Sequence, residues 1–198
     1  MSRIVFCMMA ALSLSVVSFA SILQDDVATA GLWHFETTIG DTVTPDDDSM
    51  NPGRNRDMLL TYPGTNELPP ILTEGYTGDA LLFEGSHIAR TTNFWNSSYT
   101  EFKLDCMLYI NDVPSERGSA IIYLFSSSLF ELANWPKKDT SGNIQDYMRF
   151  KMNLTSGTLT TSLPIYDLKN QWLHIVCTYS GKAMAFSITD ASGTVRSA

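Results

Sequence analysis

The sequence predicts an all-β protein, a two-sheet antiparallel sandwich of the jelly-roll type. Short apolar or alternating runs recur between turn residues, and no stretch places apolar residues at the i, i+3, i+4 and i+7 positions of a helix. Aromatic residues make up 11% of the 198 residues and charged residues 17%, a balance that favours strands. Tight turns at residues 180–182 and 191–193 indicate antiparallel hairpins.

Residues 1–20 have the pattern of a secretory signal peptide. Arg3 supplies the positive start, residues 4–17 form a short apolar segment, and small residues ending in Ala20 precede the cleavage point. A membrane-spanning helix needs about 20 apolar residues, which is more than this segment offers. We therefore expect cleavage before Ser21 and a secreted or extracytoplasmic protein, in a periplasm or at a cell surface, with no membrane insertion after cleavage.

The mature chain divides into strand-like runs separated by turns. After a short lead at residues 21–29, one domain is expected over residues 30–198, because no linker or repeat interrupts it. Polar loops are expected at residues 41–57 and 136–142, which contain proline and glycine. The predicted strands are residues 31–36, 58–62, 78–84, 87–92, 101–110, 119–125, 128–133, 146–153, 158–163, 172–179 and 183–189.

Aromatic residues on these strands are the predicted core. Trp33 and Phe35 lie two residues apart on one side of their strand, and we expect both to be buried. Phe83 and Trp172 are expected to join them. In the run 172–179, alternate residues share a face, which predicts a strand buried on one side and partly covered on the other.

Three segments resemble the laminin G-like jelly roll of the concanavalin A-like lectin/glucanase superfamily. They are residues 31–36 (GLWHFE), 78–85 (GDALLFEG) and 170–181 (NQWLHIVCTYSG), and their order and spacing agree with that family. The resemblance implies a jelly-roll sandwich over residues 30–198. The family usually continues with two or three closing strands, whereas this chain stops at Ala198 just after a turn. We therefore expect a C-terminally incomplete domain that lacks its last strands and has unpaired sheet edges.

An acidic loop offers oxygen ligands for calcium. Asp46, Asp48 and Asn51 lie in it, and it resembles the first loop of the family, of which some members bind calcium. Glu84 occupies the acidic position of the second motif and is a fourth candidate ligand. The alternative is a solvated acidic turn. Calcium is thus the single candidate cofactor.

Cys106 and Cys177 remain after cleavage of the signal peptide. In an oxidising compartment the two could form a disulfide bond. Each shares its face with apolar residues, and two separate buried thiols are the alternative that we favour.

Aromatic residues in loop-like contexts are candidates for sugar binding, because pyranose rings stack on aromatic side chains and amides add hydrogen bonds. Trp95, Asn96, Tyr99 and Trp135 are the weak candidates for this role. A cap over the end of the sandwich is the alternative.

Charge and spacing exclude other classes of function. With 13 basic and 21 acidic residues, a net charge of −8 argues against a nucleic-acid partner. Glu101 and Asp105 lie about 13 Å apart along a strand, too far for either geometry of glycoside hydrolysis. We expect a non-catalytic secreted module that binds carbohydrate or extracellular protein. A structural or adhesive sandwich of a larger surface protein is the alternative, and a glycoside hydrolase a remote one.

Overall fold

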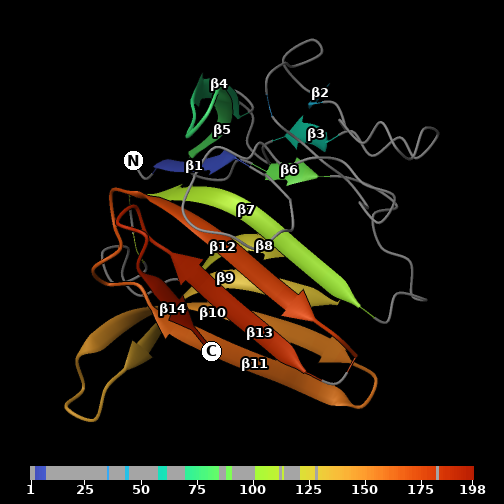
Figure 1. Ribbon diagram of the computed structural model, residues 1–198, viewed down its shortest axis with the longest axis vertical. Coiled ribbons are helices and arrows are strands. Elements are labelled where there is room, and N and C mark those ends of the chain that lie inside the picture. Colours follow the sequence, from blue (N-terminus) through green and yellow to red (C-terminus); the bar gives the residue numbers. More distant parts are fainter. Residues whose placement is uncertain are drawn as a thin grey trace. The chain divides into compact units, whose positions relative to one another are not determined.

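The computed structural model describes residues 3–7, 35, 43–44, 58–61, 70–84, 88–90, 101–111, 113, 121–127, 129–181 and 183–198. Every regular element in these residues is a β-strand, and the sheets pair antiparallel, so the predicted all-β sandwich is confirmed (Figure 1). In this part of the chain there is no helix with the length and hydropathy of a membrane span.

The chain divides into two compact units. Unit 1 comprises Met1–Tyr99 with Asp105–Leu108, and unit 2 comprises Thr100–Leu104 with Tyr109–Ala198. Strand β7 (Phe102–Ile110) therefore contributes its middle to unit 1 and its ends to unit 2. The single domain expected over residues 30–198 stays a prediction.

Unit 1 is built from short strands. They are β1 (Arg3–Cys7), β2 (Val43–Thr44), β3 (Met58–Thr61), β4 (Ile71–Glu74), β5 (Asp79–Glu84) and β6 (Ile88–Arg90). Strands β7-β1-β5-β4 are consecutive in a seven-stranded sheet, and β2-β3-β6 form a three-stranded one. The predicted strands at 58–62, 78–84 and 87–92 are confirmed as β3, β5 and β6.

Strand β1 lies within the predicted signal peptide. It pairs with β5, where Ile4 is opposite Phe83 and Phe6 is opposite Leu81. Residues 3–7 are thus a paired strand in the structure, and cleavage of the signal peptide would remove this partner of β5.

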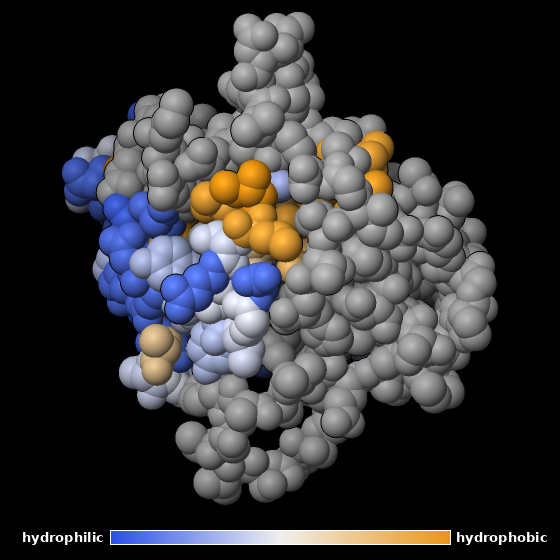
Figure 2. Space-filling view, turned by 90° about the horizontal axis from the view of Figure 1, so that it is seen from above, coloured by the Kyte–Doolittle hydropathy of each residue, from blue (hydrophilic) through white to orange (hydrophobic). Residues whose placement is uncertain are grey.

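Buried and exposed apolar residues both occur in unit 1. Phe35 is 1% exposed, whereas Phe83 is half-buried and Trp33 lies outside the described residues. Ile71 on β4, the last strand of its sheet, is 52% exposed. Figure 2 shows a group of hydrophobic residues open to view beside hydrophilic ones.

Unit 2 is a sandwich of two sheets. Its strands are β8 (Ile122–Ser126), β9 (Phe130–Lys138), β10 (Ile144–Leu154), β11 (Gly157–Pro164), β12 (Trp172–Tyr179), β13 (Met184–Thr189) and β14 (Val195–Ser197). One layer is the four-stranded sheet β11-β10-β9-β8, and the other consists of β14-β13-β12-β7, which are consecutive in the seven-stranded sheet. Both predicted hairpins are confirmed, because β12, β13 and β14 pair antiparallel in sequence.

Phenylalanine rings from both sheets fill the space between them. Phe102 on β7 lies 4.7 Å from Phe130 on β9, measured between ring centroids, and Phe150 on β10 lies 6.4 Å from Phe186 on β13. Ring pairs at such separations add to the stabilisation that burial gives. These four rings therefore join the two layers of unit 2.

Trp172 does not lie in that inner layer, so its predicted place there is wrong. Strand β12 alternates, with Leu173, Ile175 and Cys177 buried on one side. Trp172 is half-buried on the other side, where its ring and that of Tyr109 form a T-shaped pair with centroids 5.6 Å apart. The expectation of a strand buried on one side and partly covered on the other is confirmed.

Cys106 and Cys177 form no disulfide bond in the structure, and each is 0% exposed. The favoured alternative of two buried thiols therefore agrees with the observed state of Cys106 and Cys177.

Candidate functional site

One face of the sheet β11-β10-β9-β8 points away from the inner layer. Along β10 burial alternates: Met148 and Phe150 are buried, while Tyr147 and Arg149, each one residue before them, are half-buried. Residues that pair across antiparallel strands share a face, so the registers extend this face over all four strands. We call it the outer face. Its residues are Tyr123, Ser126, Glu131, Ala133, Trp135, Lys137, Gln145, Tyr147, Arg149, Lys151, Asn153, Thr158, Thr160, Ser162 and Pro164.

Trp135 lies in strand β9, and its predicted loop context is wrong. Pro136 suggested that the strand ended there, yet it pairs with Asp146. The carbonyl of Asp146 accepts a hydrogen bond from the N–H of Ile165 at 3.0 Å, on the side of β11. Pro136 and Asp146 therefore form a pair without ladder bonds between them. The missing N–H of Pro136 faces β8, whose register with β9 ends at Asn134, so no ladder bond is lost.

Two aromatic rings of the outer face lie opposite each other near the β9–β10 turn. Trp135 on β9 is directly opposite Tyr147 on β10. The guanidinium carbon of Arg149 lies 3.3 Å from the centroid of the Trp135 ring. The ammonium of Lys137 lies 5.6 Å from the centroid of the Tyr147 ring. Each ring therefore has a cation over it, an arrangement that the electron-rich ring face favours.

Glu131 anchors the charged part of this face. Arg149 donates a hydrogen bond from Nη2 to Glu131 Oε1, and Lys151 Nζ lies 3.9 Å from the other carboxylate oxygen. The side chains of Arg149 and Glu131 are only 16% and 12% exposed. Partial burial strengthens their attraction but removes hydration from both charges. The Glu131 contact, together with the ring of Trp135, fixes where the guanidinium lies.

A chain of hydrogen bonds links the outer face to the β9–β10 turn. Tyr147 donates its hydroxyl to Gln145 Oε1 at 3.1 Å, and Gln145 Nε2 donates to Asp139 Oδ2 at 3.5 Å. Asp139 also accepts the backbone N–H groups of Asn143 at 2.8 Å and Ser141 at 2.9 Å. The bond from the Asn143 backbone holds the pKa of Asp139 below its usual value. The turn thus orients Gln145 and, through it, the Tyr147 hydroxyl.

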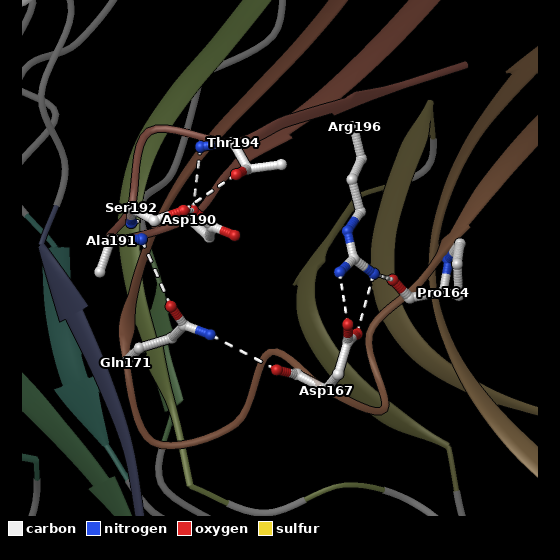
Figure 3. A network of polar contacts seen from close by, with 8 residues as sticks. All are labelled: Pro164, Asp167, Gln171, Asp190, Ala191, Ser192, Thr194 and Arg196. Atoms are coloured by element: carbon white, nitrogen blue, oxygen red, sulfur yellow. Dashed lines mark hydrogen bonds and ion pairs between the residues drawn. The ribbon is translucent and has the colours of Figure 1, made fainter.

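A second polar network lies in the β11–β12 and β13–β14 connections (Figure 3). Arg196 donates to both oxygens of Asp167, at 2.9 and 2.6 Å, and to the carbonyl of Pro164 at 2.9 Å. Gln171 donates to the Asp167 carbonyl at 3.5 Å and accepts the N–H of Ala191 at 3.3 Å. These bonds attach β14 to the connection that follows β11.

The β13–β14 turn forms around Asp190. One carboxylate oxygen accepts the N–H groups of Ser192 and Thr194 at 2.9 and 3.0 Å, and the Ser192 hydroxyl at 2.6 Å. The Ser192 hydroxyl lowers the pKa of Asp190, and the Arg196 hydrogen bonds lower the pKa of Asp167. These bonds join residues of the two connections to one another, which is the arrangement of a structural clamp.

The predicted calcium ligands lie mostly beyond the described part of the chain. Asp46, Asp48 and Asn51 fall outside it, and Glu84 is described only as the last residue of strand β5. Among the residues that the structure describes, no group of three or more His, Cys, Asp or Glu is placed to hold a metal ion. The calcium site stays a prediction.

Of the predicted sugar-binding residues, the structure places Trp135 alone. Trp95, Asn96 and Tyr99 lie outside the described residues. The partners of Trp135 were not predicted, although one signal was present. Polar and apolar residues alternate through 147–153, and the polar positions are those of the outer face.

Comparisons of the chain with protein-family models, with curated proteins and with solved structures gave no match.

Proposed function

We propose that the protein is a non-catalytic, secreted binding module of the laminin G-like type, and that its outer face binds carbohydrate. The observation that carries the proposal is the Trp135–Tyr147 pair, flanked by Gln145, Arg149 and Glu131 on one sheet face. An aromatic ring offers its face to the C–H groups of a pyranose, while amide, guanidinium and carboxylate groups bond to the hydroxyls. The rigid strands hold these groups in fixed relative positions.

The charge arrangement supports binding over hydrolysis. Glycoside hydrolysis uses two carboxyl groups about 5 to 9.5 Å apart. Glu131 is the only carboxylate among the described residues of the outer face, and it is bonded to Arg149. Its oxygens are engaged by Arg149 and Lys151, so it is not presented to a glycosidic bond as one of two facing carboxyl groups. A structural or adhesive role without a small ligand remains the competing proposal.

Trp135→Ala tests the proposal on a glycan array. We expect the wild-type protein to bind a subset of glycans and the variant to lose affinity at least about tenfold, because buried aromatic groups dominate such contacts. Tyr166→Ala is the matched control, since Tyr166 is an exposed ring, at 62%, that lies off the outer face. Its affinity should equal that of the wild type.

Thermal melting separates binding from folding. Trp135→Ala should melt cooperatively, so that a lost signal reports the site and not an unfolded chain. If the folded wild type binds no glycan, or if Trp135→Ala binds as tightly as Tyr166→Ala, the proposal is wrong. Concentration-dependent self-association without glycan binding would favour the adhesive alternative.

A further inference from the structure

We infer that the ligand of the outer face is anionic, a saccharide that carries carboxylate groups, as a uronate does. This inference rests on the proposed function and names the class of its ligand.

Positive charge is concentrated on this face. Lys137, Arg149 and Lys151 lie on it with a single described carboxylate, that of Glu131, and its other described residues are uncharged. The whole chain has the opposite balance, with 13 basic and 21 acidic residues and a net charge of −8. An anionic group is therefore attracted to the outer face and repelled by most of the remaining surface.

The two cations over the rings separate charged from neutral ligands. Arg149 lies over Trp135 and Lys137 over Tyr147. A neutral pyranose that stacks on these ring faces must displace the cations, and it offers no charge in return. An anionic saccharide gains from the same cations, because they pair with its carboxylates while the rings contact its apolar surface.

The cations differ in how far they are already neutralised. Arg149 is hydrogen-bonded to Glu131, whereas Lys151 approaches that carboxylate only to 3.9 Å. Among the described residues, no carboxylate pairs with Lys137, whose ammonium lies over the Tyr147 ring. Lys137 and Lys151 are therefore the residues whose positive charge a ligand carboxylate would neutralise.

Polygalacturonate and its methyl ester form the decisive pair of probes, because they share a backbone and differ in charge. We expect the full chain to bind polygalacturonate and not the ester, with an affinity that falls as sodium chloride is raised. Lys137→Gln and Lys151→Gln should each weaken binding about three- to fivefold, the effect of one partly exposed ion pair. Lys138→Gln is the matched control, since Lys138 is the exposed neighbour on the other side of β9 and should change nothing.

The outcomes distinguish this inference from the proposed function. Equal binding of both polymers, lost in Trp135→Ala but unchanged in Lys137→Gln and Lys151→Gln, would overturn the anionic ligand and leave carbohydrate binding intact. Binding of dextran sulfate, or of oligothymidylate, in preference to polygalacturonate would also overturn it, as would the absence of polygalacturonate binding. Glycans bound on the array in that last case would still support the proposed function.

Discussion

The ion pair between Asp167 and Arg196 attaches the last strand, β14, to the connection that follows β11. The two side chains meet through parallel hydrogen bonds, and the Asp167 side chain is 46% exposed. A paired guanidinium and carboxylate have a defined geometry, but solvent screens an exposed pair. Its contribution to stability is therefore modest, and it depends on the charge of Asp167.

Asp167→Asn should lower the free energy of unfolding at pH 7 by about 0.5–1 kcal/mol, the range of a well-oriented surface pair. The Arg196 hydrogen bonds hold the pKa of Asp167 below its unfolded value. The stabilisation is therefore present above the unfolded pKa, about 3.9, and is lost as pH falls through the folded pKa.

Urea unfolding of both proteins from pH 7 down to pH 2 measures this dependence. The difference between wild type and Asp167→Asn should be constant above about pH 5 and should close at the acid end. A difference that persists unchanged at pH 2 would show that charge at Asp167 is not its source.

At the level of elements, the β10–β11 hairpin depends on one backbone conformation. Gly157, the first residue of β11, has φ of 135°. A Cβ added there would meet no atom within 4 Å, so space is not the constraint. Residues other than glycine rarely adopt this φ, and the constraint is therefore the backbone itself.

Gly157→Ala should destabilise the protein by about 1–3 kcal/mol, the range for a residue held in such a region. Urea unfolding checks the value. Ser156→Ala, one residue earlier in the same exposed turn, is the control and should change stability little. Equal stability of Gly157→Ala and wild type would mean that the hairpin adopts another turn.

The sequence predicts where strands occur better than it predicts which strands pair and in which register. Residues 172–179 form β12 as expected, because alternation of side chains is a local property. Strand β9 continues past the predicted end at Ala133 to Lys138. A proline can stand in this strand because β8 has stopped pairing with β9 by Pro136, and the sequence around Pro136 does not show where β8 ends. The sequence therefore indicated Trp135 only as a loop residue. Its position opposite Tyr147 depends on the register of β9 and β10, which is not a local property.

At the scale of the whole molecule, residues 3–7 have two competing interpretations: part of a cleaved signal peptide, or a permanent strand of the sheet. The sequence predicts that residues 1–20 are removed on secretion. In the structure of the full chain, Arg3–Cys7 forms β1 and pairs with β5. Strand β5 also pairs with β4, from Ile71 to Glu74, so it keeps one partner in either form. The proposed function requires the secreted form, whose N-terminus is therefore the property to measure.

Mass spectrometry of the secreted protein should find an N-terminus at Ser21, because the apolar segment and the small residues before it fit signal-peptide cleavage. Without β1, the β5 amide groups that face it lose their ladder partners. Residues 79–84 should then exchange hydrogen faster in the secreted protein than in a full chain made without secretion. A secreted protein that still contains residues 3–7 would contradict the signal peptide and would favour β1 as a permanent strand of this sheet.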